Sequence, residues 1–171
     1  YCRRKMINET VIRHVAEKDA ATITRIYNHY ITDTTTSFEM KALSEDEMLG
    51  RIKDISSHYP YFVAEQKGKV VGYCYVHQWK NRAAYCNTLE VTIYLDPEHK
   101  GCGTGSLLMK HLIEACRKLD GCKNLIACIT EENAESIAFH KRMGFEKVSH
   151  FKKVGYKLGR WLDVVDMEMM L

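Results

Sequence analysis

The feature that most constrains the fold of this chain is a strand, glycine turn and helix pattern between Leu89 and Ser106. β-Branched and aromatic residues make 89–95 typical of a strand, and Asp96-Pro97 ends it because proline supplies no donor to a β-ladder. Glycines at 101, 103 and 105 then alternate through a turn, which leads into an apolar stripe at helical spacing over 107–119. The pattern predicts an α/β arrangement in which a helix begins directly after the turn.

A glycine turn at a helix start can bind a phosphate. The first N–H groups of the helix are unpaired and carry roughly half a positive charge, and glycine lets the backbone approach an anion without interference from a Cβ. The Walker pattern is absent because no lysine precedes Ser106. The dinucleotide fingerprint fits poorly, because the spacing is G-x-G-x-G and Gly121-Cys122 stand where an acidic ribose ligand is expected. From the residues alone, the turn is either a phosphate-binding site or an ordinary connection between a strand and a helix.

The turn resembles the acetyl-CoA loop of the GNAT N-acetyltransferase superfamily, [QR]-x-x-G-x-[GA], with Lys100 at the first position. Lysine keeps the charge and lacks the forked geometry of arginine. The resemblance extends from Val11 to Met169 and narrows to the phosphinothricin and methionine-sulfone acetyltransferase branch. The strings that carry it are TSFE at 36–39, YPYFVAE at 59–65, WKNRAAY at 79–85, EVTIYLDPEHKGCGTG at 90–105, N-x-x-S-x-x-F-H-x-x-x-G-F at 133–145 and GYKLGRWLDVV at 155–165.

The resemblance implies the GNAT fold, an α/β (α+β) architecture. Its central sheet is mixed and mostly antiparallel, with a splayed pair of parallel strands and flanking helices. Local patterns point the same way: a capping box at 44–47, a hairpin of 61–66 and 70–78, a third run at 84–95, a strand at 124–130 parallel to the third run, and a closing hairpin around 155–160.

Length and composition favour one domain over residues 6–171, because 171 residues suffice for one full core. Residues 1–5, YCRRK, are either a short native extension or residues added in cloning. The net charge is +3 and no block of like charges stands out, so nucleic-acid binding has little support. No stretch reaches the roughly 18 consecutive apolar residues of a membrane helix, and no signal core is seen at the start, so neither membrane nor export is expected.

The cysteines argue against disulfides and metals. Their number, seven, is odd and none forms a C-x-x-C pair, so neither a disulfide framework nor a zinc site is expected. A reducing cytoplasm is the simplest setting.

The resemblance implies acetyl-CoA as the acetyl donor and no metal. The pyrophosphate would bind the N–H groups of the glycine turn, the pantetheine arm would pair with the backbone of 93–95, and the N–H of Leu95 would polarise the thioester carbonyl. The expected cofactor-binding residues are Ile93, Tyr94, Leu95, Lys100, Gly101, Cys102, Gly103, Thr104, Gly105, Ser106, Asn133 and Ser136.

Glu90 and His140 are the expected catalytic residues. An ammonium cannot attack a thioester, so a base must take its proton, and Glu90 lies in an otherwise apolar strand that raises its basicity. The alternative is that Glu90 faces solvent, with Glu39, Glu65 and Asp96 as weaker bases. His140 would protonate the leaving thiolate, or would only pack against the cofactor. Catalysis through Cys102 is less favoured, because direct transfer uses no acyl-enzyme.

The acceptor is expected to be the amine of a small amino-acid-like molecule of the phosphinothricin, methionine sulfone or sulfoximine type. In the branch, the loop at 79–85 holds the acidic groups of the substrate; from the residues alone it is a solvated hairpin tip. The expected acceptor-binding residues are Phe38, Glu39, Lys80, Arg82 and Tyr85. The alternatives are a polyamine, an aminoglycoside, a protein amine, or a non-catalytic acetyl-CoA-binding regulatory module. The resemblance also implies a homodimer.

Overall fold

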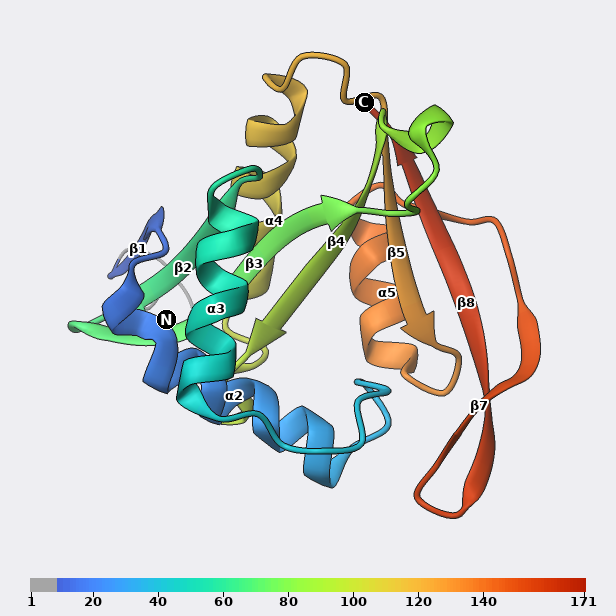
Figure 1. Ribbon diagram of the computed structural model, residues 1–171, viewed down its shortest axis with the longest axis horizontal. Coiled ribbons are helices and arrows are strands. Elements are labelled where there is room, and N and C mark those ends of the chain that lie inside the picture. The colour runs from blue at the N-terminus through green and yellow to red at the C-terminus, as the bar shows by residue number, and fades with distance from the viewer. Residues whose placement is uncertain (1–8) are drawn as a thin grey trace.

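The computed structural model describes residues 9–171, so the predicted extension at residues 1–5 lies outside the described residues. The described chain forms one eight-stranded sheet with helices on both faces (Figure 1). The strands are β1 (Thr10–His14), β2 (Tyr61–Gln66), β3 (Lys69–Gln78), β4 (Thr88–Leu95), β5 (Asn124–Thr130), β6 (Glu146–Lys147), β7 (Phe151–Lys157) and β8 (Arg160–Met170). The helices are α2 (Ala20–Asp33), α3 (Glu45–Ser56), α4 (Thr104–Arg117) and α5 (Ala134–Arg142), with short 3₁₀ turns η1 (Glu17–Asp19), η2 (Ala83–Tyr85) and η3 (Pro97–His99).

The sheet is mixed and mostly antiparallel, which confirms the predicted architecture. Its order is β1-β2-β3-β4-β5-β8-β6, with β7 also paired to β8. Within residues 9–171, β4 and β5 are the parallel pair, as a helical crossover between two strands of one sheet requires. They stay in register only from Thr88 to Glu90, and Figure 1 shows them diverging beyond that point.

Two apolar layers hold the sheet between its helices. On one face, Ile23 and Ile26 of α2 and Ile52 of α3 pack against Val63 and Tyr73 of the sheet. The opposite layer is built on α4, and its buried side chains include Leu108, Met109, Leu112, Leu125 and Phe145. Burial of each such side chain contributes roughly 1.5–3 kcal/mol. The two layers hold the sheet in place, and with it the point at which β4 and β5 separate.

Several local predictions are confirmed at this level. The Ser44 hydroxyl accepts from the N–H of Glu47, and the Glu47 carboxylate accepts from the N–H of Ser44, which is the expected capping box. The third run is shorter than predicted, because η2 forms a turn and β4 begins only at Thr88. No helix among residues 9–171 is long and apolar enough to cross a membrane.

Candidate active site

The glycine turn forms the start of α4, and its backbone conformation requires glycine at two positions. Gly101 has a φ of 74° and Gly103, the N-cap residue, a φ of 90°. Both values lie in the left-handed region, which side chains disfavour. A Cβ at Gly101 would contact nothing within 4 Å, so open space surrounds this part of the turn. The turn therefore presents the start of a helix to an open surface, as an anion site requires.

A cavity of about 180 Å³, here called the glycine-turn cavity, lies against this turn. Ten of the twelve residues predicted to bind the cofactor line it: Ile93, Tyr94, Leu95, Lys100, Gly101, Gly103, Gly105, Ser106, Asn133 and Ser136. The two others do not. Thr104 is buried and its hydroxyl accepts from Gln66 at 3.1 Å, whereas the Cys102 thiol donates to the carbonyl of Lys100 at 3.4 Å.

The split between β4 and β5 exposes backbone groups at one wall of this cavity. The N–H of Asp96 donates to Val71 on β3, and successive N–H groups of a strand face opposite edges. The N–H groups of Leu95 and Ile93 therefore face the split, whereas the N–H of Tyr94 faces β3. The carbonyl of Leu95 accepts from the Tyr30 hydroxyl at 2.6 Å, so it is already occupied. Free N–H donors beside a helix start suit an extended amide chain that ends in a phosphate.

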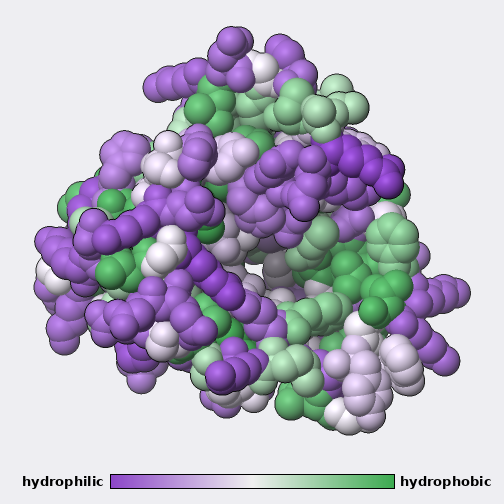
Figure 2. Space-filling model, in the orientation of Figure 1, coloured by the Kyte–Doolittle hydropathy of each residue, from purple (hydrophilic) through white to green (hydrophobic). Residues whose placement is uncertain are grey.

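A second cavity of about 870 Å³, here called the large cavity, adjoins the first. Figure 2 shows a hollow near the middle of this face, with hydrophobic residues gathered on the β7–β8 side. The two cavities share a set of lining residues on β4, α5 and the loop after α2: Thr36, Ile93, Tyr94, Asn133 and Ser136. The shared wall means that ligands in the two cavities meet at the split.

Glu90 lies in the large cavity and is half-buried, with its side chain 25% exposed. Its Oε1 is 3.9 Å from Nε2 of His77 on β3. Burial raises the pKa of the Glu90 carboxyl; His77 opposes this rise, and Asp166 adds to it. The raised pKa makes this carboxylate a stronger base than that of an exposed glutamate. Glu90 is also the last residue of β4 in register with β5, so this base lies where the sheet splits.

His140 lines the large cavity from α5 and is only 4% exposed. Its Nδ1 lies 2.9 Å from the carbonyl of Ser136, which can only accept, so Nδ1 carries the proton. Burial lowers the pKa of the His140 ring, although the bond to Ser136 opposes this effect. The neutral ring therefore has an unprotonated Nε2.

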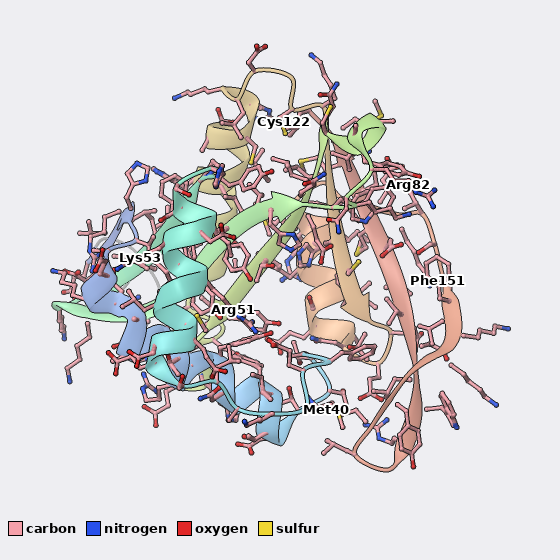
Figure 3. All side chains as sticks on the ribbon, viewed as in Figure 1. Met40, Arg51, Lys53, Arg82, Cys122 and Phe151 are labelled. Atoms are coloured by element: carbon pink, nitrogen blue, oxygen red, sulfur yellow. The ribbon has the colours of Figure 1, made fainter. Side chains whose placement is uncertain are left out.

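Phe38 and Glu39 lie in the loop after α2, and both line the large cavity. Glu39 is paired with Arg51, whose guanidinium donates to its two oxygens at 2.6 and 2.9 Å; Figure 3 shows Arg51 extending from α3. This pairing holds the pKa of the Glu39 carboxyl below its usual range, and Tyr27 donates a further hydrogen bond to it. Glu39 therefore ties the loop to α3, and Arg51 already neutralises its charge.

The loop at 79–85 brings one of its two cations to the large cavity. Lys80 lines the cavity, and its Nζ lies 4.0 Å from the Trp79 ring centre and 5.3 Å from that of Tyr85. Arg82 and Tyr85 do not line either cavity.

Other residues of the two cavities were not predicted from sequence. In the glycine-turn cavity they are Tyr30, Thr36, Glu135, Phe139 and Arg142. In the large cavity they include Tyr27, His77, Cys128 and Asp166. Asp166 stands out in the sequence as a charged residue within the mostly apolar run VVDMEMM at 164–170. Only the strand register shows which face of the sheet it occupies. Among the described residues no group of three or more His, Cys, Asp or Glu could hold a metal ion.

Comparisons with known proteins agree with this geometry. The family described as "Acetyltransferase (GNAT) domain" matches residues 12–165. The phosphinothricin N-acetyltransferase of Alcaligenes faecalis is 37% identical over 162 residues, which cover 94% of this chain and 82% of that protein. The L-methionine sulfoximine/L-methionine sulfone acetyltransferase of Salmonella typhimurium is 33% identical over 162 residues, 94% of each chain. A phosphinothricin acetyltransferase from Sinorhizobium meliloti, solved with acetyl-CoA, superposes with a TM-score of 0.91 at 36% identity, covering 95% of this chain and 89% of that one. The predicted resemblance is confirmed.

Proposed function

The chain belongs to the GNAT acetyltransferase family, and we propose that it moves an acetyl group from acetyl-CoA to the amine of a small amino-acid-like acceptor. The observation that carries this proposal is the shared wall of the two cavities at the β4–β5 split. One cavity suits a phosphate-ended thioester donor, and the other contains a carboxyl of raised pKa. Relatives that act on phosphinothricin and on methionine sulfone or sulfoximine support the class of acceptor.

The donor would be held by the backbone. The N–H groups at the start of α4 would bind the pyrophosphate, with Lys100 as a nearby positive charge. The N–H groups of Ile93 and Leu95 would bind the pantetheine arm, and that of Leu95 would polarise the thioester carbonyl. When bound, acetyl-CoA supplies the activated acetyl group. These positions fit because the turn is open, the donors face the split, and ten predicted residues line one cavity.

Glu90 would take the proton of the acceptor ammonium at its carboxylate. An α-ammonium has a pKa of about 8 or above, so it is mostly protonated at neutral pH and cannot attack until a base removes the proton. The raised pKa of Glu90 brings the base closer to the pKa of the amine, and its half-buried position shields the transfer from water. Direct attack in a ternary complex then needs no enzyme-bound acetyl group.

His140 would supply the proton to the leaving thiolate, and this role has a definite pH signature. The ring can donate from Nε2 only when it is protonated, and burial lowers its pKa below the ordinary 6.5. Under this role, activity falls as the pH rises through that lowered pKa. A ring that only packs against the donor gives no such decline, and His140→Gln would then keep the parent's pH profile.

Lys80 is the cation best supported as the partner of the acceptor's carboxylate, because it lines the large cavity and Arg82 does not. Both residues were predicted for this role. Paired variants separate them: Lys80→Met should lower kcat/KM for amino-acid acceptors at least tenfold, whereas Arg82→Met, its control on the same loop, should change it little.

We propose that the chain is a cytoplasmic homodimer. Six free cysteines among the described residues suit a reducing compartment. The β7–β8 hairpin exposes five large apolar side chains, Phe151, Val154, Tyr156, Leu158 and Trp161, each at least 49% exposed. Such a patch favours association with a second copy. Light scattering with Trp161→Lys tests the interface, and a monomeric parent would refute it.

The experiment that tests the function is a panel of amines with acetyl-CoA, read by release of free CoA. Methionine sulfone, methionine sulfoximine and phosphinothricin should be acetylated, and Glu90→Gln should lose most of the activity. A parent that prefers a polyamine, an aminoglycoside or a protein amine would overturn the acceptor class. A parent that binds acetyl-CoA and acetylates none of these amines would be a regulatory module.

A further inference from the structure

Asp166 is a carboxylate of the large cavity for which the proposed reaction has no use. It lies on β8, directly across from Cys128 on β5, and the Cys128 thiol donates to its Oδ1 at 2.9 Å. Both residues line the cavity. A thiol is a weak donor, and a carboxylate can accept about four hydrogen bonds. Most of the accepting capacity of Asp166 is therefore open to a ligand.

The strand register places Asp166 and Glu90 on the same face of the sheet. Glu90 is in register with Ile126 of β5, and Cys128 lies two residues further along that strand, on the same face. Asp166 is thus on the second strand from that of Glu90, at least two strand spacings or about 10 Å away, and it is near enough to raise the pKa of Glu90. A ligand whose amine lies at Glu90 reaches Asp166 with the far end of a short side chain.

Phe38, one of the predicted acceptor-binding residues, lies in the same part of the cavity as the β7–β8 hairpin that carries Asp166. Phe38 covers Gly155 of β7, and Phe151, Val154 and Val164 of the same hairpin also line the cavity. The side-chain end of an acceptor that faces Phe38 therefore lies beside β7 and β8. Asp166 is the carboxylate that β8 adds to this otherwise apolar wall.

No lysine or arginine in the described lining of the cavity forms an ion pair with Asp166. Glu39 is already paired with Arg51, and Lys80 is the one lysine or arginine that the described lining contains. A bound amino acid would direct its ammonium to Glu90 and its carboxylate to Lys80. Asp166 is then left without a cationic partner in a half-buried wall, where charges interact more strongly than in water.

Resting on the proposed function, we propose that Asp166 determines which amino acids this enzyme acetylates. It favours acceptors whose side chain carries a hydrogen-bond donor or a positive charge, such as the N–H of a sulfoximine. It disfavours the anionic phosphinate of phosphinothricin, because like charges in a shielded site repel. A sulfone has neither a donor nor a charge and ranks between the two.

The test is kcat/KM for methionine sulfoximine, methionine sulfone and phosphinothricin, in the parent and in Asp166→Asn. The parent should rank them in that order. Asp166→Asn should raise the phosphinothricin-to-sulfoximine ratio about tenfold or more, because the amide removes the charge and keeps the shape. Asp163→Asn is the matched control: Asp163 is on the same strand, bonds His150 and the N–H of Lys153, and does not line the cavity. The phosphinothricin-to-sulfoximine ratio of Asp163→Asn should equal that of the parent.

A parent that prefers phosphinothricin, or a ratio that Asp166→Asn leaves unchanged, would overturn the role of Asp166 while acetylation of amino acids continues. Failure of the proposed function has a different signature, because the parent would then acetylate none of the three acceptors. Calorimetry with acetyl-CoA shows whether the variant is folded. If Asp166→Asn does not fold, the nearly isosteric Asp166→Leu and the parent's own ranking decide the question.

Discussion

A methyl group added at Gly155 tests whether the loop that carries Phe38 shapes the large cavity. Gly155 lies in β7, and a Cβ built there would overlap the Phe38 ring. Its φ is outside the left-handed region, so alanine has no backbone strain of its own at this position. The effect of Gly155→Ala therefore arises at the ring.

The size of the effect depends on which group moves. The loop backbone is held in place, because buried Lys157 donates to the carbonyl of Ser37 and Thr130 donates to that of Thr35. Phe38 is 41% exposed, so its ring has room to swing outward. Overpacking a closed core costs about 1–3 kcal/mol, so we expect the lower end, about 1 kcal/mol, in the free energy of unfolding. The displaced ring should also lower kcat/KM for the acceptor about tenfold, which corresponds to about 1.4 kcal/mol.

Urea unfolding and steady-state kinetics measure the two effects. Gly50→Ala is the control for stability, because Gly50 lies within α3 with nothing near its missing Cβ. That variant should gain about 0.5–1 kcal/mol. Acetyl-CoA affinity should stay at the parent's value in both variants. A Gly155→Ala enzyme with the parent's specificity for amino acids would refute the idea that Phe38 bounds the acceptor.

Three further predictions concern the donor, the base and the loop. Gly103→Val forces a side chain into a φ of 90°, which costs about 1–3 kcal/mol and should weaken acetyl-CoA binding about tenfold by calorimetry. Glu90→Gln should lower turnover on the order of a hundredfold. In the parent the base acts only when ionised, so the rate should fall as the pH drops through the raised pKa of Glu90, above the ordinary 4.5, and pH-rate profiles should show this limb only where Glu90 is present. Lys157→Met leaves the Ser37 carbonyl without its donor; the free energy of unfolding should fall by about 1–3 kcal/mol, and KM should rise for the acceptor and not for acetyl-CoA.

The parts of the structure that sequence predicted are those whose signals are local. The strand at 124–130 and the capping box of α3 depend on neighbouring residues, and both are found where expected. The glycine turn belongs to the same group, because a left-handed φ at two alternate positions leaves little choice of residue.

The remaining parts depend on contacts between distant segments. Arg51 and Glu39 are twelve positions apart, and only the packing of α3 against the loop after α2 pairs them. By residue type alone, the forked geometry of arginine favours Arg82 over Lys80 as the partner of a carboxylate, but the position of a side chain depends on where its loop lies, and Lys80 is the one that lines the cavity. Asp166 could be noticed in the sequence, yet its cavity is made by β5 and β8, which pair only in the folded sheet.

The split of the sheet links these observations physically. A strand paired on both edges has no backbone donor left for a ligand. β4 loses its partner after Glu90, so Ile93 and Leu95 gain free N–H groups on the same strand that carries the base. The position at which pairing stops therefore sets the distance between the base and the donors along one rigid element. A substitution that extends the pairing of β4 and β5 beyond Ile126 would occupy the N–H groups of Ile93 and Leu95 and close the space between the strands, while leaving Glu90 in place.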